Sequence, residues 1–159
     1  MLVVLSDTHG QDGHRLSDSF RDLVESASLV VHAGDFTTVD VLDAFERVAE
    51  EFVAVAGNSD NHEVQQRLPE TQTVTFEGKR IVVTHGHRRD ETELSLLARQ
   101  ERADIVVVGH THRAGFKRVG EVAVVNPGSH ADPRGGQATV AVLSREADDL
   151  RLRFLTRRG

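Results

Sequence analysis

The segment VVVGHTH, residues 106–112, joins a run of β-branched apolar residues to a glycine and two histidines. The apolar run begins at Ile105 and predicts a buried strand that ends in a polar loop. In extended backbone, residues i and i+2 point to the same side, so His110 and His112 would face one spot. Imidazole is the commonest protein metal ligand, so a metal is one candidate for that spot. For this segment alone, a surface turn that carries two histidines is the simpler interpretation.

The same pattern, an apolar strand followed by a glycine-bearing polar loop, occurs four more times along the chain. These loops contain DTH (7–9), GD (34–35), GN (57–58) and HGH (85–87). Asp, Asn and Gly are ordinary turn residues, but histidine is not, and five of the nine histidines lie in these five loops. In α/β sheets, functional sites lie outside the carboxyl ends of the strands. We therefore expect these side chains to converge.

The periodicity of apolar residues predicts an α/β fold. Apolar residues at helical spacing predict helices over 14–27, 38–51 and 92–103. Short apolar runs predict one strand in each of the segments 2–6, 29–35, 52–60 and 104–112. Alternation and glycine-bearing turns predict hairpins over 71–87, 115–129 and 137–156. The βαβαβ first half favours parallel strands and the hairpins favour a mixed sheet, so we expect a two-sheet sandwich with helices on its outer faces, in one domain spanning 1–159.

Composition narrows the class of protein. A chain of 159 residues buries roughly 70% of its unfolded surface, which is enough for a core. The absence of cysteine excludes disulfides, thiolate metal sites and a cysteine nucleophile, and is consistent with a cytoplasmic location. Neither a signal peptide nor an apolar run of about 18 residues is present, so no membrane association is expected. The net charge of −6 argues against nucleic acid as a partner.

The loop side chains form a set of oxygen and nitrogen ligands that is too large for one tetrahedral ion. The set is Asp7, His9, Asp35, Asn58, His85, His110 and His112. Clustered carboxylates and imidazoles would be costly to desolvate without a cation, and this ligand chemistry suits Mn, Fe, Zn, Ni or Co, with Mn favoured here. Two such ions about 3.5–4 Å apart are the arrangement that cleaves phosphoesters.

In their order, DTH, GD, GN, HGH and GHTH resemble the calcineurin-like metallophosphoesterases, and NPGS (126–129) and PRGG (133–136) resemble the small single-domain phosphodiesterase branch. The resemblance implies a four-layer αββα sandwich and a metal-dependent phosphodiesterase of small phosphoesters. It implies that one ion is held by Asp7, His9, Asp35 and His112. The other ion would be held by Asp35, Asn58, His85 and His110. Asp35 would bridge both ions, a hydroxide between them would be the nucleophile, and Asp35, Asn58 and His85 would form the catalytic set.

One position departs from the family pattern. Many members have a histidine after the Gly-Asn, thought to bind phosphate and assist the leaving group, whereas this chain has Ser59. A serine cannot act as an imidazolium acid, so we expect good activity only on esters with an acidic leaving group. Ser59, His87 and Arg134 are candidates for contact with the substrate.

Other polar residues are interpreted more simply. His32 is expected to be a core histidine bonded to backbone, and His14, His62 and His130 are expected at the surface. Asp60 is expected to cap a helix or support a ligand, and Asn126 to fix a loop. Arg88, Arg89 and Arg113, each individually, are more typical of solvated charges than of phosphate ligands.

The sequence leaves two other functions open. The retromer scaffold subunit resembles this family but has lost ligand histidines and acts as an interaction surface, so a metal-binding scaffold is one alternative. A nuclease or nucleotide phosphatase is the other, although no basic or aromatic nucleic-acid platform is evident. The resemblance also allows a homo-oligomer, since small members of the family often self-associate.

Overall fold

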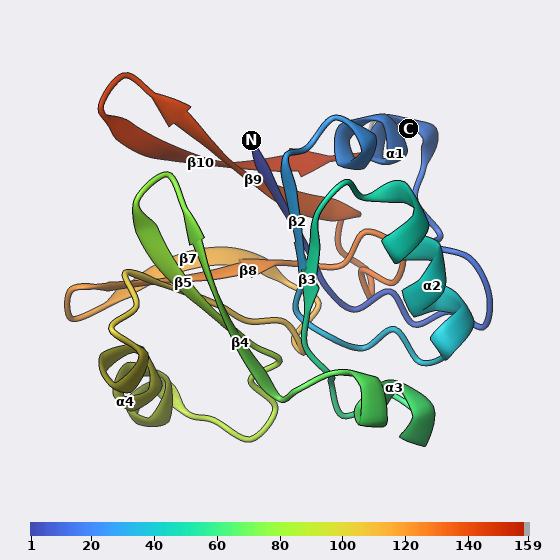
Figure 1. Cartoon of the computed structure of the whole chain (residues 1–159), viewed down its shortest axis with the longest axis horizontal. Coiled ribbons are helices and arrows are strands. Elements are labelled where there is room, and N and C mark those ends of the chain that lie inside the picture. Colours follow the sequence, from blue (N-terminus) through green and yellow to red (C-terminus); the bar gives the residue numbers. More distant parts are fainter. Residues whose placement is uncertain (158–159) are drawn as a thin grey trace.

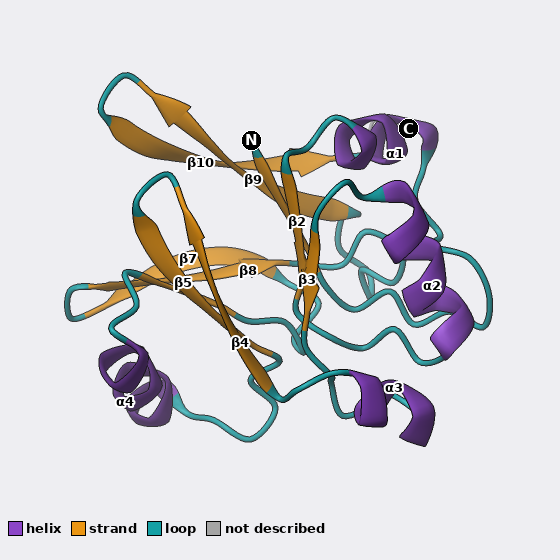
Figure 2. Cartoon of the chain, in the orientation of Figure 1, coloured by secondary structure: helices purple, strands orange, loops and turns teal. Residues whose placement is uncertain are grey.

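The computed structural model describes residues 1–157 and contains two five-stranded sheets and four helices (Figures 1 and 2). The strands are β1 Leu2–Leu5, β2 Leu29–His32, β3 Phe52–Ala54, β4 Thr71–Phe76, β5 Lys79–Thr84, β6 Ile105–Val107, β7 Ala114–Val119, β8 Val122–Pro127, β9 Thr139–Glu146 and β10 Asp149–Thr156. The helices are α1 Asp18–Glu25, α2 Val39–Val48, α3 His62–Arg67 and α4 Glu91–Glu101. Residues 158 and 159, the end of the expected domain, lie outside the described residues. None of the described helices is long and apolar enough to cross a membrane.

Both sheets are mixed, as the sequence predicted. The first sheet has the strand order β10-β9-β1-β2-β3, with β1, β2 and β3 parallel and β9 antiparallel to β1. The second has the order β4-β5-β6-β8-β7, with β5, β6 and β8 parallel. The three expected hairpins are present as β4–β5, β7–β8 and β9–β10.

The two sheets pack face to face, and helices cover their outer faces. In β1, Leu2 and Val4 belong to the core between the sheets, whereas Val3 and Leu5 pack in the layer under α1 and α2. Successive residues of a strand point to opposite faces, so a strand buried on both sides must be apolar throughout. Helix α4 covers the second sheet and lies on the opposite side of the molecule from α1 and α2 (Figure 1). The αββα prediction is therefore confirmed.

The predicted boundaries were less accurate than the architecture. Helix α1 begins only at Asp18, because the Ser17 side chain accepts the Phe20 N–H and caps the helix there. The predicted first turn from His14 is instead a loop. Helix α3 was not predicted, since it is six residues long and buries only Val64. So short a helix carries too few apolar residues for periodicity to reveal it.

The fold brings the polar loops together through backbone hydrogen bonds. The Asp7 N–H donates to the Gly34 carbonyl at 3.0 Å, which joins the loops after β1 and β2. The Gly109 N–H donates to the His85 carbonyl at 3.1 Å, which joins the loops after β5 and β6. The His110 N–H donates to Asp7 Oδ2 at 3.0 Å and links the two sheets. The strand ends of both sheets thus meet in one place.

Candidate metal centre

Five of the predicted ligands converge in a buried cluster. Asp35 Oδ2 lies 3.2 Å from Nε2 of both His9 and His85. Asp7 Oδ1 lies 3.4 Å from His112 Nε2, 3.7 Å from His9 Nε2 and 3.8 Å from His85 Nε2. Two overlapping groups, Asp7–His9–His112 and Asp7–Asp35–His85, each place their ligand atoms within 4.8 Å of one another. A metal ion could be held by either group.

Backbone carbonyls orient two of the imidazoles. His85 Nδ1 lies 2.7 Å from the Ala33 carbonyl oxygen, and His112 Nδ1 contacts the Asp132 carbonyl oxygen. A carbonyl can only accept, so each Nδ1 carries the proton. In the neutral ring, Nε2 then presents a lone pair to the cluster. This is the orientation that metal-binding histidines usually have.

Hydrogen bonds orient the carboxylates in the same way. The Ser6 hydroxyl donates to Asp7 Oδ2 at 2.7 Å, and the Ser59 N–H donates to Asp35 Oδ1 at 2.8 Å. In each carboxylate, one oxygen is occupied and the other faces the histidines. Ser6 was not singled out from the sequence; its position directly before Asp7 at the end of a strand was the available signal.

The buried atoms at the centre of the cluster lack partners. Among the described residues, Asp7 Oδ1, His9 Nε2 and His85 Nε2 are buried without a hydrogen bond. Imidazole lone pairs that face carboxylate oxygens repel one another unless a cation lies between them, and buried unpaired polar atoms are costly. The oxygen and nitrogen donors fit a divalent transition metal. The residues present therefore fit the metal that the sequence predicted.

Without a metal ion, protons bound to the histidines offset part of the negative charge of the Asp7 and Asp35 carboxylates. The carboxylates of Asp35 and Asp7 raise the pKa of His9 to about 9. Burial lowers the pKa of His85, but the neighbouring Asp35 and Asp7 outweigh it, so the net change is upward. Burial likewise raises the pKa of Asp35, and His85 and His9 overcome this and hold it well below its usual range. The cluster is therefore an anionic site that attracts positive charge.

The remaining two predicted ligands lie at the rim beside His85. His110 Nδ1 is 3.1 Å from Asn58 Oδ1, and the ring centroids of His85 and His110 are 5.4 Å apart. Both rim residues are exposed, unlike the central cluster. The structure thus places all seven predicted ligands in one neighbourhood, five in the buried cluster and two at its solvent side.

The three candidate substrate contacts lie on two sides of the cluster. The His87 ring centroid is 5.4 Å from that of His85, and burial lowers the pKa of His87. Ser59 is exposed and follows Asn58. Arg134 lines a cavity that His112 also lines, and its Nε is 3.8 Å from Asp132 Oδ2. His87 and Ser59 are therefore beside the rim residues, whereas Arg134 is on the His112 side.

The backbone is left-handed at five of the seven predicted ligands. The φ angles are 56° at Asp7, 45° at His9, 65° at Asp35, 71° at His110 and 59° at His112. A non-glycine residue in this region costs about 1–3 kcal/mol, and such strain gathers at functional sites. Nothing in the sequence pattern revealed this conformation, which aims successive loop side chains into one spot.

Asp60 and Gly57 hold the Asp35 loop in place. The buried Asp60 carboxylate accepts the N–H groups of Gly57 at 2.7 Å, Thr37 at 2.8 Å and Asp35 at 3.1 Å. It therefore supports a ligand, and Asn61 is the residue that caps α3. A Cβ atom at Gly57 would overlap Asp35 Oδ1, which explains the glycine of the Gly-Asn motif.

The expectation that His130 is a surface residue was wrong. His130 is 4% exposed, and its Nε2 lies 2.9 Å from Thr8 Oγ1. His32 Nε2 lies 2.9 Å from the same hydroxyl, so His32 is a core histidine as predicted. The pairing of β1 with β9 carries the preceding loop under the DTH segment, and the Ser129 hydroxyl donates to the Asp7 carbonyl at 2.7 Å. This long-range contact has no local sequence signal.

The other polar residues divide between expected and unexpected roles. Asn126 fixes the GHTH loop as predicted, donating to the Gly109 carbonyl at 2.8 Å and to Thr111 Oγ1 at 3.0 Å. His62 is exposed as expected, whereas His14 is half-buried and accepts the Leu16 N–H at 3.0 Å. Arg15 was not singled out from the sequence. Its guanidinium donates to the carbonyls of Thr8 and His9 at 2.7 Å and so stabilises the loop after β1.

Comparison with known proteins identifies the family to which the chain is similar. The calcineurin-like phosphoesterase superfamily domain matches residues 1–148. The chain is 30% identical to a probable metallophosphoesterase from Methanothermobacter thermautotrophicus, with 94% of this chain and 88% of that protein covered. It is 27% identical to a phosphodiesterase from Methanocaldococcus jannaschii, with 94% and 96% covered.

Comparison with solved structures supports the same fold. A single mutant of Vps29 from Entamoeba histolytica superposes with a TM-score of 0.77 at 22% identity, covering 99% of both chains. At that identity the likeness shows the fold alone. Since the family domain spans nearly the whole chain and the architecture agrees with it, this chain belongs to the calcineurin-like phosphoesterase superfamily.

Proposed function

We propose that this protein is a phosphodiesterase that holds two divalent transition-metal ions in the candidate metal centre. The observation that carries the proposal is the convergence of Asp7 Oδ1, His9 Nε2 and His85 Nε2, all buried and without a protein partner. The proposal is also supported by relatives that are called metallophosphoesterase and phosphodiesterase. Manganese is the ion we favour, with Ni, Fe, Zn and Co as the others that this ligand chemistry suits.

Asp35 is the carboxylate that we propose is shared between the ions. Asp7, His9 and His112 would complete one site, and Asn58, His85 and His110 the other. Asp7 Oδ1 also lies between histidines of both sites, at 3.7 Å from His9 and 3.8 Å from His85. The distance from Asp35 Oδ2 to the same two nitrogens is shorter, 3.2 Å in each case, and this favours Asp35 as the bridge.

The residues of this chain supply position and charge for phosphoryl transfer. When bound, divalent ions lower the pKa of a water molecule and neutralise charge on the phosphate. Such a transfer needs mainly positioning and electrostatic stabilisation, so no covalent protein intermediate is required. We propose that His87 and Arg134 contact the phosphate from opposite sides of the cluster, and that Ser59 leaves space near the leaving group.

The structure offers little support for the alternative functions. A protein-interaction scaffold needs an exposed apolar patch, but among residues 1–157 the large apolar side chains that are well exposed are Leu96 and Phe116. A nuclease needs a cationic surface with aromatic side chains, and the chain has a net charge of −6 with 4% aromatic residues. A small phosphodiester therefore remains the substrate class we propose.

The first test is hydrolysis of bis-(p-nitrophenyl) phosphate by metal-stripped protein, with Mn, Ni, Co, Zn or Mg added back singly. We expect metal-dependent turnover, with p-nitrophenyl phosphate much slower. Metal content is measured in parallel by mass spectrometry. Absence of turnover with two ions bound would point to a different reaction, and absence of both turnover and binding would refute the metal centre and leave the scaffold.

A further inference from the structure

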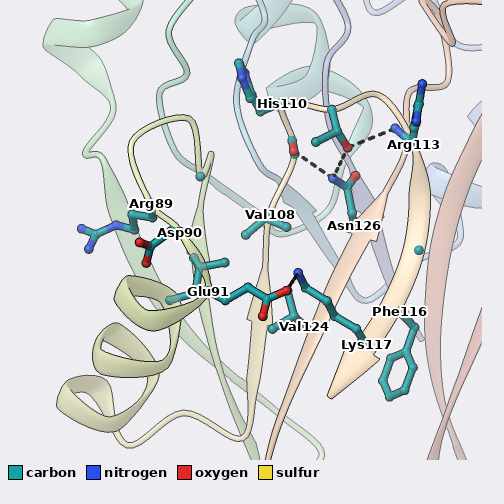
Figure 3. Close-up of a pocket in the computed structure, with 15 residues that line it drawn as sticks. Arg89, Asp90, Glu91, Val108, His110, Arg113, Phe116, Lys117, Val124 and Asn126 are labelled. Carbon is teal, nitrogen blue, oxygen red and sulfur yellow. Dashed lines mark hydrogen bonds and ion pairs between the residues drawn. The ribbon is translucent and has the colours of Figure 1, made fainter. Parts of the chain in front are cut away.

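A groove of about 490 Å³ runs along the outer face of the second sheet, between α4 and the edge strand β7 (Figure 3). It exists because α4 packs on β5 and β6 and leaves the outer faces of β8 and β7 partly uncovered. Its floor is apolar and consists of Leu94, Val108 and Val124. A volume of this size is within the range typical of small-molecule sites, which is about 300–1,000 Å³.

A pair of charged side chains closes one end of the groove. The Lys117 ammonium pairs with the Glu91 carboxylate at 2.6 Å and closes one end between β7 and α4 (Figure 3). Arg89 and Arg113 also line the groove, but their guanidinium groups point away from it (Figure 3). The neighbouring Asp90 is occupied as the cap of α4, because it accepts the Glu93 N–H at 2.9 Å. The charged groups that line the groove are therefore occupied within the protein or directed away from it, which suits an apolar ligand group.

The open end adjoins the metal centre. Gly86, Gly109 and His110 line it, and His110 is also at the rim of the cluster, 5.4 Å from the His85 ring. A phosphodiester bound at the centre therefore has the groove directly beside it. Asn126 also lines the groove, but its amide is bonded to Gly109 and Thr111 and its oxygen to the Gly128 N–H. Neither end of the amide is left to bind a polar group.

We propose that this groove binds an apolar, ring-sized ester group of the phosphodiester substrate, while the phosphate itself lies at the metal centre. This inference rests on the proposed function, because it assigns the groove to the substrate of the same centre. An apolar ring fits the floor of leucine and valine side chains, whereas a methyl ester would leave the groove filled with water. The substrate class is thus a diester with at least one aryl or comparably apolar group.

Gly115 provides a way to fill the groove. It lies on β7 two residues before Lys117, whose register partner is the floor residue Val124, so both face the groove. A Cβ atom at Gly115 would meet nothing within 4 Å, so Gly115→Phe is the variant chosen to direct a ring into the groove. Arg118→Phe is the matched control, because it adds the same ring to the opposite face of the same strand.

The experiment compares diphenyl phosphate with dimethyl phosphate as competitive inhibitors of the manganese-loaded protein. Burial of a ring is expected to make diphenyl phosphate at least about tenfold the better inhibitor in the wild type and in Arg118→Phe. The preference should shrink to about twofold or less in Gly115→Phe. Gly115→Leu serves the same purpose if the phenylalanine variant does not fold. Equal inhibition in the wild type, or a preference that survives Gly115→Phe, would overturn the proposal.

A second readout separates this inference from the proposed function. Diphenyl phosphate is titrated into metal-free ¹⁵N-labelled protein, and the amide shifts of Leu94, Gly115 and Val124 are followed. Shifts there, lost in Gly115→Phe, support the groove even if no metal gives turnover, in which case only the proposed function fails. No shifts at these three amides, whatever the activity, would contradict the groove as a binding site.

Discussion

The Ser59 backbone N–H donates to Asp35 Oδ1 at 2.8 Å, and this bond turns Oδ2 of Asp35 toward His9 and His85. The residue after Asn58 therefore acts on the centre through its main chain. Because Oδ1 has a partner and Oδ2 is 3.2 Å from both imidazoles, the Asp35 carboxylate is fixed in an orientation that suits a shared ligand.

Asp35→Asn tests that shared role. The amide keeps the shape and the bond from Ser59 but removes the charge that two cations would share, so we expect kcat/KM for bis-(p-nitrophenyl) phosphate to fall by at least about 100-fold. Circular dichroism should show an unchanged fold. Asp40→Asn, at an exposed position of α2, is the matched control and should retain full activity. Near-normal turnover in Asp35→Asn would refute the bridge.

The identity of Ser59 predicts how the rate depends on the leaving group. A serine hydroxyl has no proton to give near neutral pH, so the leaving group must depart unaided and the rate should fall steeply as its pKa rises. We expect the slope of log kcat/KM against leaving-group pKa, measured with a series of aryl diesters, to be unchanged in Ser59→Ala. Alkyl monoesters hydrolysed as fast as aryl diesters would contradict the prediction.

The sequence was enough to predict which ligands come together, but not all of the residues that hold those ligands in place. Parallel strands of one sheet place their carboxyl ends at one edge, so the pattern of strands and loops was enough to expect Asp7 and Asp35 together. The position of His130 depends on a hydrogen bond and a strand pairing between distant segments, which no local pattern encodes. Left-handed backbone at five of the aspartate and histidine ligands was not predicted either, because both residue types adopt right-handed and extended conformations far more often.

Backbone strain at His110 predicts that this residue lowers the stability of the metal-free protein while its ring is needed for activity. His110 is exposed and has a φ of 71°, which only glycine adopts freely. His110→Gly and His110→Ala both remove the ring, so both should lose activity to a similar degree. Relief of strain should make the metal-free glycine variant more stable than the alanine variant by about 1 kcal/mol in urea unfolding. Equal stabilities would show that this backbone conformation is not strained.

Burial of His130 predicts acid sensitivity of the fold. Burial, with smaller contributions from Arg15 and His14, lowers the pKa of His130 from 6.5 to about 3. Below pH 6.5 the unfolded chain therefore binds a proton that the folded chain does not, and the unfolding free energy falls as the pH falls. His130→Gln can keep the contact with Thr8 but cannot titrate. Between pH 7 and pH 5, the wild type should lose about 2 kcal/mol more of its unfolding free energy than this variant.

The comparison with His62→Gln isolates the effect of burial. His62 is exposed on α3, so His62→Gln makes the same replacement at the surface and serves as the matched control. Urea unfolding of metal-free protein at several pH values measures all three chains under the same conditions, and the carboxylates of the metal centre contribute equally to each. Parallel stability curves for the wild type and His130→Gln would show that His130 is protonated as readily in the folded chain as in the unfolded one.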